Sequence, residues 1–335
     1  MKAGQQTLLS RSHQLIAEAA VTRLLAKPKH HVIRRRPRSR VAVLSAESYS
    51  DRLEQVLWQG LNLFHLDVRG KTVLLKPNLV DYIPGSHINT QPLLVSAAAE
   101  CFGRLGAKTV LVGEGPGHQR DTELVLLESG FADLLRQQRI HFVDLNRDEL
   151  VETQLLAHYT GMKSLWLPRT VLESDFIVSM PKMKTHHWSG VTLSMKNMFG
   201  VVPGVKYGWP KNILHWKGIQ ESILDICATV PIHFVIADAV VAMEGNGPLN
   251  GTPRCLDRIV LADDPVAADA TCARLMGLDA EKIAHIRAAA RFLGHCAIER
   301  IDQLAETACS TDAPFQTVPE YKYLRVCDRP GGPDL

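Results

Sequence analysis

The chain has 335 residues, of which 46% are hydrophobic and 22% charged, a composition typical of a globular protein. This length accommodates one large domain or two closely packed lobes. The formal net charge of +3 is small for such a chain, so no nucleic acid is expected as a partner. No apolar stretch is long enough for a membrane-spanning helix, and none is expected.

Seven cysteines are spread along the chain, and the nearest pair, Cys296 and Cys309, is separated by thirteen positions. This spacing excludes the C-x₂-C clusters of ferredoxin-type iron–sulfur centres and zinc ribbons, so no ferredoxin-type cluster is expected. An odd, irregularly spaced set also argues against a disulfide framework. We therefore predict reduced thiols and a cytoplasmic location.

Residues 1–39 are predicted to form a basic N-terminal extension that consists of an amphipathic helix and a linker. Apolar residues recur at helical spacing, and the linker carries the run RRRPRSR at residues 34–40. Docking of the helix on the body, or on a second subunit of a homo-oligomer, is the simplest interpretation. One short basic run is weak evidence for the alternatives, which are a membrane surface and a nucleic acid.

Residues 40–306 are predicted to form one α/β core, in one domain or two lobes, because short apolar segments alternate with helical patterns. The expected strands are 41–45, 72–76, 109–112, 140–144, 176–180, 234–238 and 258–262. The expected helices are 50–59, 92–105, 122–137, 217–229, 265–276 and 280–293. This alternation predicts a mostly parallel sheet with helices on both faces and a site at the carboxyl ends of the strands. The C-terminal tail, 307–335, is rich in Pro, Asp and Gly and is expected to wrap the surface.

The segment PKMKTHHWSGVTLSMKNMFG, at residues 181–200, is the strongest site candidate. It follows directly on the apolar strand 176–180, so its cations would gather at a strand end and suit an anion. The predicted catalytic residues are Lys182, Lys184, His186 and His187. The lysines would clamp an anion, and a histidine would act as a base, a proton shuttle or a metal ligand. Lys196 and Asn197 are predicted to bind the substrate.

Two further strand ends carry polar groups. Lys76 and Asn78 place a cation and an amide at the end of strand 72–76. The sequence GEGPG, at 113–117, joins a strand to a helix, where glycines allow the backbone to approach an anion closely. The predicted substrate-binding residues here are Lys76, Asn78, Gly115 and Gly117, with Glu114 as the exposed chemical group. A tight turn is the equal alternative, since neither the Walker nor the dinucleotide pattern is present.

Asp238, Glu244 and Asn246 offer oxygen ligands in or beside a glycine-rich loop. Such loops suit hard divalent cations, whereas added imidazole suits a transition metal. Together with Glu114, these residues are the predicted ligands of a divalent metal, with Fe or Mg favoured. A simple turn is the alternative, because the EF-hand spacing is absent.

Two other features bear on the site. Segment 200–216 contains several helix breakers and is expected to form a long mobile loop or lid. Trp188, Trp209 and Trp216 could wall a cleft for an organic substrate or pack in the core. Asp269 lies one turn inside a predicted helix that begins with an Asp-Pro cap, and it could face either way.

Taken together, these motifs resemble the domain-of-unknown-function family numbered 362. The matching segments are VLLKPNLV (73–80), GEGPG (113–117), DFIVSMPKMKTHHWSGVTLSMKNMFGVVPG (175–204), MEGNGPLNGTPR (243–254) and DDPVAADATCARLMGL (263–278). The resemblance implies one core domain with a common site. It also implies an association with iron–sulfur chemistry, although this chain lacks the cysteine pattern of the ferredoxin-like module found in several members.

We therefore predict a metal-dependent enzyme that acts on a small organic anion, with redox chemistry suggested by the family association. Lysines hold the anion, and a histidine serves as the acid–base group or as a metal ligand. A metal-free enzyme that binds phosphate or a nucleotide is the first alternative. A non-catalytic binding or electron-transfer partner is the second.

Overall fold

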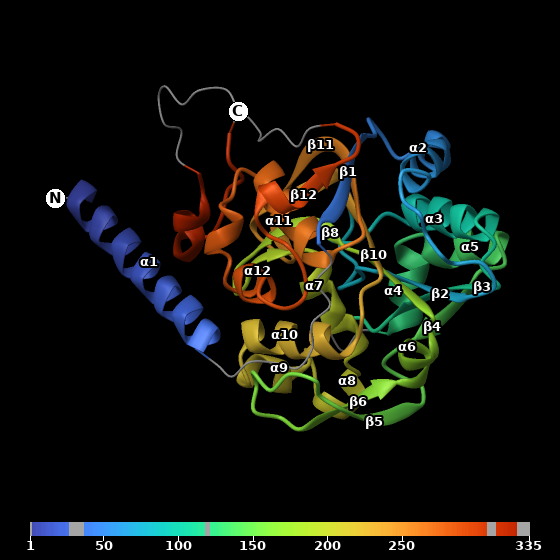
Figure 1. The fold of residues 1–335 in the computed structure, drawn as a ribbon, viewed down its shortest axis with the longest axis horizontal. Coiled ribbons are helices and arrows are strands. Elements are labelled where there is room, and N and C mark those ends of the chain that lie inside the picture. Colours follow the sequence, from blue (N-terminus) through green and yellow to red (C-terminus); the bar gives the residue numbers. More distant parts are fainter. Residues whose placement is uncertain (1, 27–36, 118–120, 307–312, 327–335) are drawn as a thin grey trace.

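The computed structural model describes residues 2–26, 37–117, 121–306 and 313–326. The linker residues 27–36, with three of the five arginines of the predicted basic run, lie outside this described part, as do residues 307–312 and 327–335 of the predicted tail. A large sheet forms the centre of the molecule, with strand order β12-β1-β11-β10-β7-β2-β3-β4 (Figure 1). Its strands are β1 (Ser39–Ser45), β2 (Thr72–Pro77), β3 (Thr109–Glu114), β4 (His141–Asp144), β7 (Phe176–Met180), β10 (Phe234–Asn246), β11 (Asn250–Ala262) and β12 (Ile301–Gln303).

The half of the sheet from β10 to β4 is parallel. Strands β10, β7, β2, β3 and β4 pair in parallel with their neighbours, whereas β11 runs antiparallel between β1 and β10. The long β10–β11 hairpin extends well beyond the predicted strands 234–238 and 258–262. A separate hairpin consists of β5 (Leu150–Gln154) and β6 (Ser164–Pro168). This arrangement confirms the predicted α/β fold with a mostly parallel sheet.

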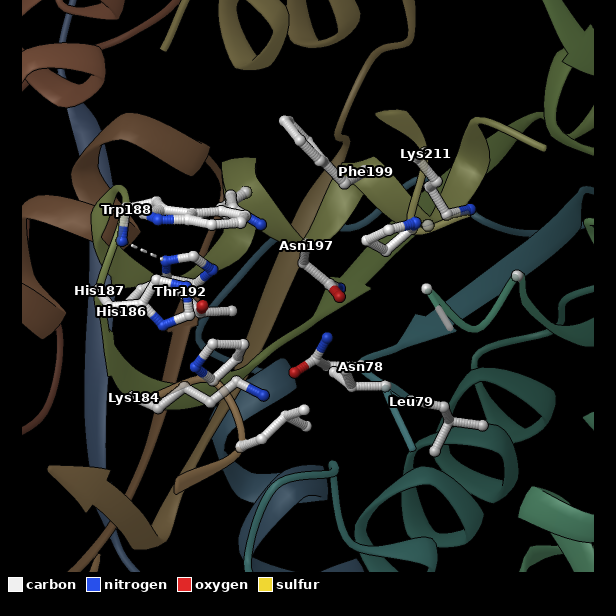
Figure 2. Close-up of a pocket in the computed structure, with 18 of the residues that line it drawn as sticks. Asn78, Leu79, Lys184, His186, His187, Trp188, Thr192, Asn197, Phe199 and Lys211 are labelled. Carbon is white, nitrogen blue, oxygen red and sulfur yellow. Dashed lines mark hydrogen bonds between the residues drawn. The ribbon is translucent and has the colours of Figure 1, made fainter. Parts of the chain in front are cut away.

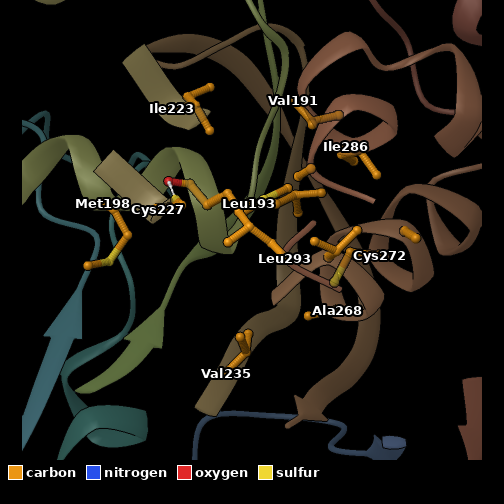
Figure 3. Packing of buried hydrophobic residues seen from close by; sticks show 14 of the residues in the cluster. Val191, Leu193, Met198, Ile223, Cys227, Val235, Ala268, Cys272, Ile286 and Leu293 are labelled. Carbon is orange, nitrogen blue, oxygen red and sulfur yellow. Dashed lines mark hydrogen bonds between the residues drawn. The ribbon is translucent and has the colours of Figure 1, made fainter. Parts of the chain in front are cut away.

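Helices cover both faces of the sheet, as alternating side chains of one strand show. In β2, Val73 and Leu75 belong to one buried cluster and Leu74 to the other, because successive side chains of a strand point to opposite faces. The first cluster is covered by α2 (Arg52–Leu61), α3 (Pro92–Arg104) and α5 (Phe131–Gln137). The second is covered by α10 (Ile219–Thr229), α11 (Pro265–Leu275) and α12 (Ala284–Ala289). Figure 3 shows Ile223, Cys272 and Ile286 of these last three helices around Leu193, with Val235 of the sheet below them.

Three predicted elements differ from the structure. The helix expected over 122–137 is two helices, α4 (Thr122–Glu128) and α5, because Gly130 between them has φ +79°. The helix expected over 280–293 is shortened to the 3₁₀ turn η2 (Ala280–Lys282) and α12. The segment 200–216, expected to form a long mobile loop or lid, is not an irregular loop, because it carries η1 (Met198–Val201), α8 (Gly204–Tyr207) and α9 (Asn212–Trp216).

The N-terminal helix α1 (Lys2–Ala26) lies along the outside of the body (Figure 1). Its carboxyl end is anchored by the buried side chains of Val21 and Leu24 and by an ion pair of 3.0 Å between Arg23 and Glu221. The chain ends in η3 (Ile298–Arg300), β12 and η4 (Pro319–Leu324), and α1 contacts η4 and α12. Within the described residues, no helix is long and apolar enough to cross a membrane.

Candidate functional site

The lysine–histidine run is itself a strand rather than a loop at a strand end. Pro181 lacks an N–H group and separates β7 from β8 (Lys182–His186), while its carbonyl accepts a hydrogen bond of 2.9 Å from Asp238 N. Strand β8 continues alongside β10 in parallel and pairs with β9 (Gly190–Thr192) on its other side. Because side chains alternate along a strand, Lys182, Lys184 and His186 lie on one face of β8.

A cavity of about 220 Å³ opens beside β8, just beyond the carboxyl ends of β2 and β3 (Figure 2). Strand β8 supplies Lys184 and His186, and the short helix α7 (Ser194–Asn197) supplies Lys196 and Asn197. The cavity therefore lies at the carboxyl edge of the parallel strands, the usual position of ligands in open α/β sheets.

Lys76 and Glu114 form a buried ion pair at the base of this cavity. The distance from Lys76 Nζ to Glu114 Oε2 is 2.5 Å, and Nζ also donates to Asn197 Oδ1 at 3.2 Å. Burial lowers the pKa of Lys76, and the nearby Glu114 carboxylate partly offsets this effect. The prediction that Glu114 is exposed is wrong, because its side chain turns inward to pair with Lys76 and the residue is buried. Lys76 is held behind Glu114 and does not line the cavity.

Lys182 belongs to a second buried ion pair, which lies outside the cavity. Its Nζ atom is 2.8 Å from Asp238 Oδ2 and 2.8 Å from the hydroxyl of Tyr49. Tyr49 in turn donates to Asp238 Oδ1 at 2.7 Å, and the backbone N–H of Gln91 donates to Oδ2 at 3.0 Å. The polar groups of this network satisfy one another, and Lys182, one of the predicted catalytic residues, does not line the cavity.

The four predicted metal ligands do not come together. Glu114 and Asp238 are committed to separate lysines, and Glu244 binds Arg254 at 2.8 Å. Asn246 lies exposed at the end of β10, opposite Asn250 in the hairpin. Among the described residues, no three His, Cys, Asp or Glu side chains are placed to hold a metal ion. The predicted ligand set therefore does not fit Fe or Mg, because each of its carboxylates already neutralises a protein cation.

Three lysine amines line the cavity without a carboxylate partner among the described residues. Lys184 is fully buried and donates to the carbonyl of Ile88 at 2.6 Å, and burial, together with Lys196 and Lys182, places its pKa well below the usual value. Lys196 Nζ lies 4.3 Å from the centre of the Phe199 ring, and burial with the nearby Lys76 lowers its pKa to about 8.

The third amine belongs to Lys211, which precedes α9. Its Nζ atom donates to the carbonyl of Val202 and, at 3.4 Å, to Asn146 Oδ1. Burial lowers the pKa of Lys211 to about 7. Glu114 is the one carboxylate among the described lining residues, and it is already bound to Lys76.

The two adjacent histidines, His186 and His187, differ in which ring nitrogen acts as a hydrogen-bond acceptor and which as a donor. His186 Nδ1 accepts hydrogen bonds from the backbone N–H groups of Trp188 (2.9 Å, dashed in Figure 2) and Ser189 (3.3 Å), so Nδ1 carries no proton. Burial and the nearby Lys196 keep the pKa of His186 well below its usual value. The ring is therefore neutral, with its proton on Nε2, which makes that atom a hydrogen-bond donor.

His187 has the other tautomer. Its Nδ1 atom lies 2.7 Å from the carbonyl oxygen of Gly247, which can only accept, so Nδ1 carries a proton, and in the neutral form of the ring Nε2 carries the lone pair. The rings of His186 and His187 lie 4.9 Å apart. His215 resembles His187, because its Nδ1 is 3.3 Å from the carbonyl of Lys211. A donor and an acceptor thus lie side by side at the cavity.

The cavity brings together most, but not all, of the predicted residues. Those that line it are Asn78, Glu114, Gly115, Gly117, Lys184, His186, His187, Lys196 and Asn197. Those that do not are Lys76, Lys182, Asp238, Glu244 and Asn246. A Cβ at Gly115 would lie 2.8 Å from both Asn146 Oδ1 and the carbonyl of Gly200, so the packing at this edge of the cavity requires a glycine.

Sequence reasoning missed Thr192, Lys211 and His215, which also line the cavity. The pattern K-x-K-x-H from Lys182 to His186 has the period of a strand and could have predicted β8 and its shared face. No comparable signal marks Lys211 and His215. They lie in segment 200–216, which was predicted to be a loop because it contains several helix breakers. Trp188 lines the cavity, whereas Trp216 is 78% exposed and does not.

Comparisons with known proteins give one family match and several distant relatives. Residues 73–274 match the family model described as Domain of unknown function (DUF362). A thylakoid-associated protein of Synechocystis sp. (strain ATCC 27184 / PCC 6803 / Kazusa) is 28% identical over 219 residues, which make up 63% of this chain and 64% of that protein. The chain thus spans less than two thirds of the length of this curated relative.

Two solved structures show distant similarity. The lactate racemase apoprotein from Thermoanaerobacterium thermosaccharolyticum is 15% identical with a TM-score of 0.43, over 73% of this chain and 58% of that chain. A protein from Thermotoga maritima is 12% identical with a TM-score of 0.36, over 63% of this chain and 55% of that chain.

Proposed function

The chain belongs to the DUF362 family, and from that premise we propose that its cavity binds a small organic anion and transfers a proton on it. The observation that carries this proposal is the set of amines of Lys184, Lys196 and Lys211 around one cavity. Burial disfavours their charged forms, and none of the three forms an ion pair with a carboxylate among the described residues. The Glu114 carboxylate partly offsets this effect at Lys184 and Lys211, but it is itself bound to Lys76. An anionic ligand supplies the missing counter-charge.

The size of the cavity favours a small ligand over a nucleotide. Its volume of about 220 Å³ lies below the range of roughly 300–1,000 Å³ that is typical of pockets for drug-sized molecules. The side chains of Trp188 and Phe199 and the glycine-containing edge at Gly115 and Gly117 complete the wall. We therefore favour a compact carboxylate or phosphate compound as the substrate.

The two histidine tautomers support acid–base chemistry on this anion. His186 Nε2–H can donate to an oxygen of the substrate and stabilise negative charge that develops there. His187 Nε2 can accept a proton from the substrate, since its lone pair is available. The lysines would orient the substrate by its anionic group. This division of roles uses both histidines without a change of tautomer before the reaction.

The proposal needs no metal ion, because the predicted carboxylate ligands do not fit one. If the enzyme instead depends on a metal, as the alternative hypothesis and the family association with redox chemistry suggest, a chelator should abolish ligand binding. Thermal unfolding of the purified protein with a panel of small carboxylates and phosphates, with and without EDTA, separates the two. We expect at least one anion to raise Tm equally in both conditions.

The matched variants are Lys196→Met and Lys206→Met. Both lysines lie over an aromatic ring, Lys206 Nζ at 4.8 Å from the centre of the Trp166 ring, but Lys206 is exposed and outside the cavity. Lys196→Met should abolish the anion-dependent rise in Tm, and Lys206→Met should retain it. A rise that requires a divalent metal would contradict the proposal and favour the metal-dependent enzyme. No response to any anion would favour the non-catalytic alternative.

A further inference from the structure

We propose that the ligand of this cavity carries a hydroxyl group beside its anionic group, and that the side chain of Asn78 selects for this hydroxyl. The inference rests on the proposed function, because it concerns the same cavity. It goes further in naming the class of ligand, a hydroxylated organic anion, and the residue that determines specificity.

Asn78 presents a buried hydrogen-bond acceptor that has no donor. Its side chain lines the cavity, the residue is 8% exposed, and no described residue donates to its Oδ1 atom. The backbone around it is fixed by two hydrogen bonds to Thr90, one from Asn78 N to Thr90 Oγ1 and one from Thr90 N to the Asn78 carbonyl, both 2.9 Å. Buried acceptors are nearly always paired in native proteins, so a donor on the ligand is the natural partner.

The neighbours of Asn78 favour a hydroxyl as that donor. In Figure 2 the amide oxygen of Asn78 lies on the side that faces Lys184, whose amine also points into this part of the cavity. Thr192 is opposite Lys184 in the β8–β9 ladder, and its buried Oγ1 atom also has no partner among the described residues. A hydroxyl can donate to Asn78 and accept from the Lys184 amine at the same time.

An ammonium group fits this position less well. It could donate to Asn78 Oδ1, but it cannot accept a hydrogen bond from Lys184. It would also add a positive charge near Lys196 and Lys182, whose charges already act on Lys184. Amino-substituted anions should therefore bind more weakly than hydroxylated ones.

The Asn78 side-chain oxygen contributes no hydrogen bond to the fold, which allows function and stability to be separated. Replacement by leucine, which has nearly the same shape, removes an unpaired polar group from a buried position. In the absence of ligand, Asn78→Leu should therefore unfold at the same or a higher Tm than the wild type. A residue retained for a structural hydrogen bond would show a lower Tm.

The test compares pairs of anions that differ by one hydroxyl. The probes are glycolate against acetate, 2-hydroxybutyrate against butyrate, and 2-hydroxypropyl phosphate against propyl phosphate, with glycine as the amino counterpart of glycolate. Binding is measured by thermal shift and titration calorimetry for the wild type, Asn78→Leu and Thr192→Val. The carboxylate and phosphate pairs also show which anionic group the lysines prefer.

We expect the wild type to bind the hydroxylated member of the preferred pair about tenfold more tightly, the effect of one hydrogen bond. Asn78→Leu should bind both members with the affinity that the wild type has for the deoxy compound. Equal binding of both members by the wild type would overturn the inference, as would a preference that survives in Asn78→Leu. If the wild type binds deoxy and hydroxylated anions equally well, the proposed function stands and this inference alone fails. If no anion binds, both fail.

Discussion

The lysines at this edge of the sheet fall into two groups: those paired with a buried carboxylate, and those without a carboxylate partner among the residues described. Lys76 and Lys182 are each bound to a buried carboxylate, at 2.5 Å and 2.8 Å, and hold strand ends together. Lys196, by contrast, lies beside an aromatic ring and has no carboxylate partner among the residues described. Removal of one member of a buried pair typically costs about 3–5 kcal/mol, because the other charge is left uncompensated.

The Lys76–Glu114 pair can be tested through a neighbouring glycine. A Cβ atom at Gly200 would lie 1.8 Å from Glu114 Oε1 and 2.5 Å from Lys76 Nζ, so Gly200→Ala must separate the pair. We expect it to reduce the free energy of unfolding, measured with urea, by about 3 kcal/mol. Gly117→Ala is the matched control, since no described residue other than its chain neighbours has an atom within 4 Å of its Cβ position. Equal stability of the two variants would show that the pair does not stabilise the fold.

The identity of these partners could not be predicted from the sequence. Glu114 is 38 positions from Lys76, and Asp238 is 56 positions from Lys182, so their contacts depend on the order of strands in the sheet. Composition and motifs indicated that the acids and the lysines lie near strand ends, which is correct. They gave no information on which acids neutralise lysines, and for that reason they did not predict that the proposed metal ligands lie apart, with each of the three carboxylates paired with a protein cation.

At the scale of elements, the short helix α7 positions Lys196 and Asn197. Four residues are too few for a helix to be stable by itself, so tertiary contacts must hold it. Asp269 of α11 provides them: its Oδ1 atom accepts from Ser194 N at 2.7 Å and from Ser194 Oγ at 2.5 Å, and its Oδ2 atom accepts from Met195 N at 3.2 Å. The side chain of Asp269, whose orientation could not be predicted from the sequence, therefore faces inward.

Asp269→Asn tests this role. The amide nitrogen would face a backbone donor, so at least one of the three hydrogen bonds is lost and α7 loosens. We expect a loss of about 1–3 kcal/mol in the free energy of unfolding, together with weaker anion binding. The control, Asp279→Asn, alters a residue that caps η2 through a single hydrogen bond from Glu281 N at 3.0 Å, outside the cavity. Anion binding by Asp269→Asn at the wild-type level would contradict the positioning role.

Strands and helices of ordinary length were predictable because their patterns are local. The apolar strands 176–180 and 72–76 and the helix 92–105 lie within one residue of the structure. Elements that depend on distant partners were not predictable. Strand β8 forms only because β10 continues beyond the sheet centre and pairs with it. Three of the five residues of β8 carry an amine or an imidazole. Polar strands of this kind lack the apolar alternation by which strands are recognised.

At the scale of the whole molecule, burial of several amines links stability to pH. The pKa of Lys196 is about 8 and that of Lys211 about 7 in the folded protein, against an ordinary value of 10.5. Between pH 7 and 8 the unfolded chain therefore binds more protons at these positions than the folded protein does. Stability increases with pH wherever the unfolded state binds more protons.

We therefore expect the contribution of these lysines to raise the free energy of unfolding from pH 7 to pH 8. The measurement is urea unfolding of the wild type, Lys196→Met and Lys206→Met at several pH values in this window. The rise should be smaller in Lys196→Met and unchanged in Lys206→Met. A saturating anion should also reduce it, because a bound anion returns the amines to their charged form. An identical slope in all three proteins would exclude a lowered pKa for Lys196.

Proton uptake on anion binding is the most direct test of an anion site built from uncompensated amines. Proton uptake is measured by titration calorimetry at pH 8 in two buffers of different ionisation enthalpy. The ligand is the anion that gives the largest rise in Tm. Because Lys211 is mostly neutral and Lys196 about half neutral at that pH, binding should take up a large fraction of a proton or more, and less in Lys196→Met. Anion binding without proton uptake, or with proton release, would contradict the account.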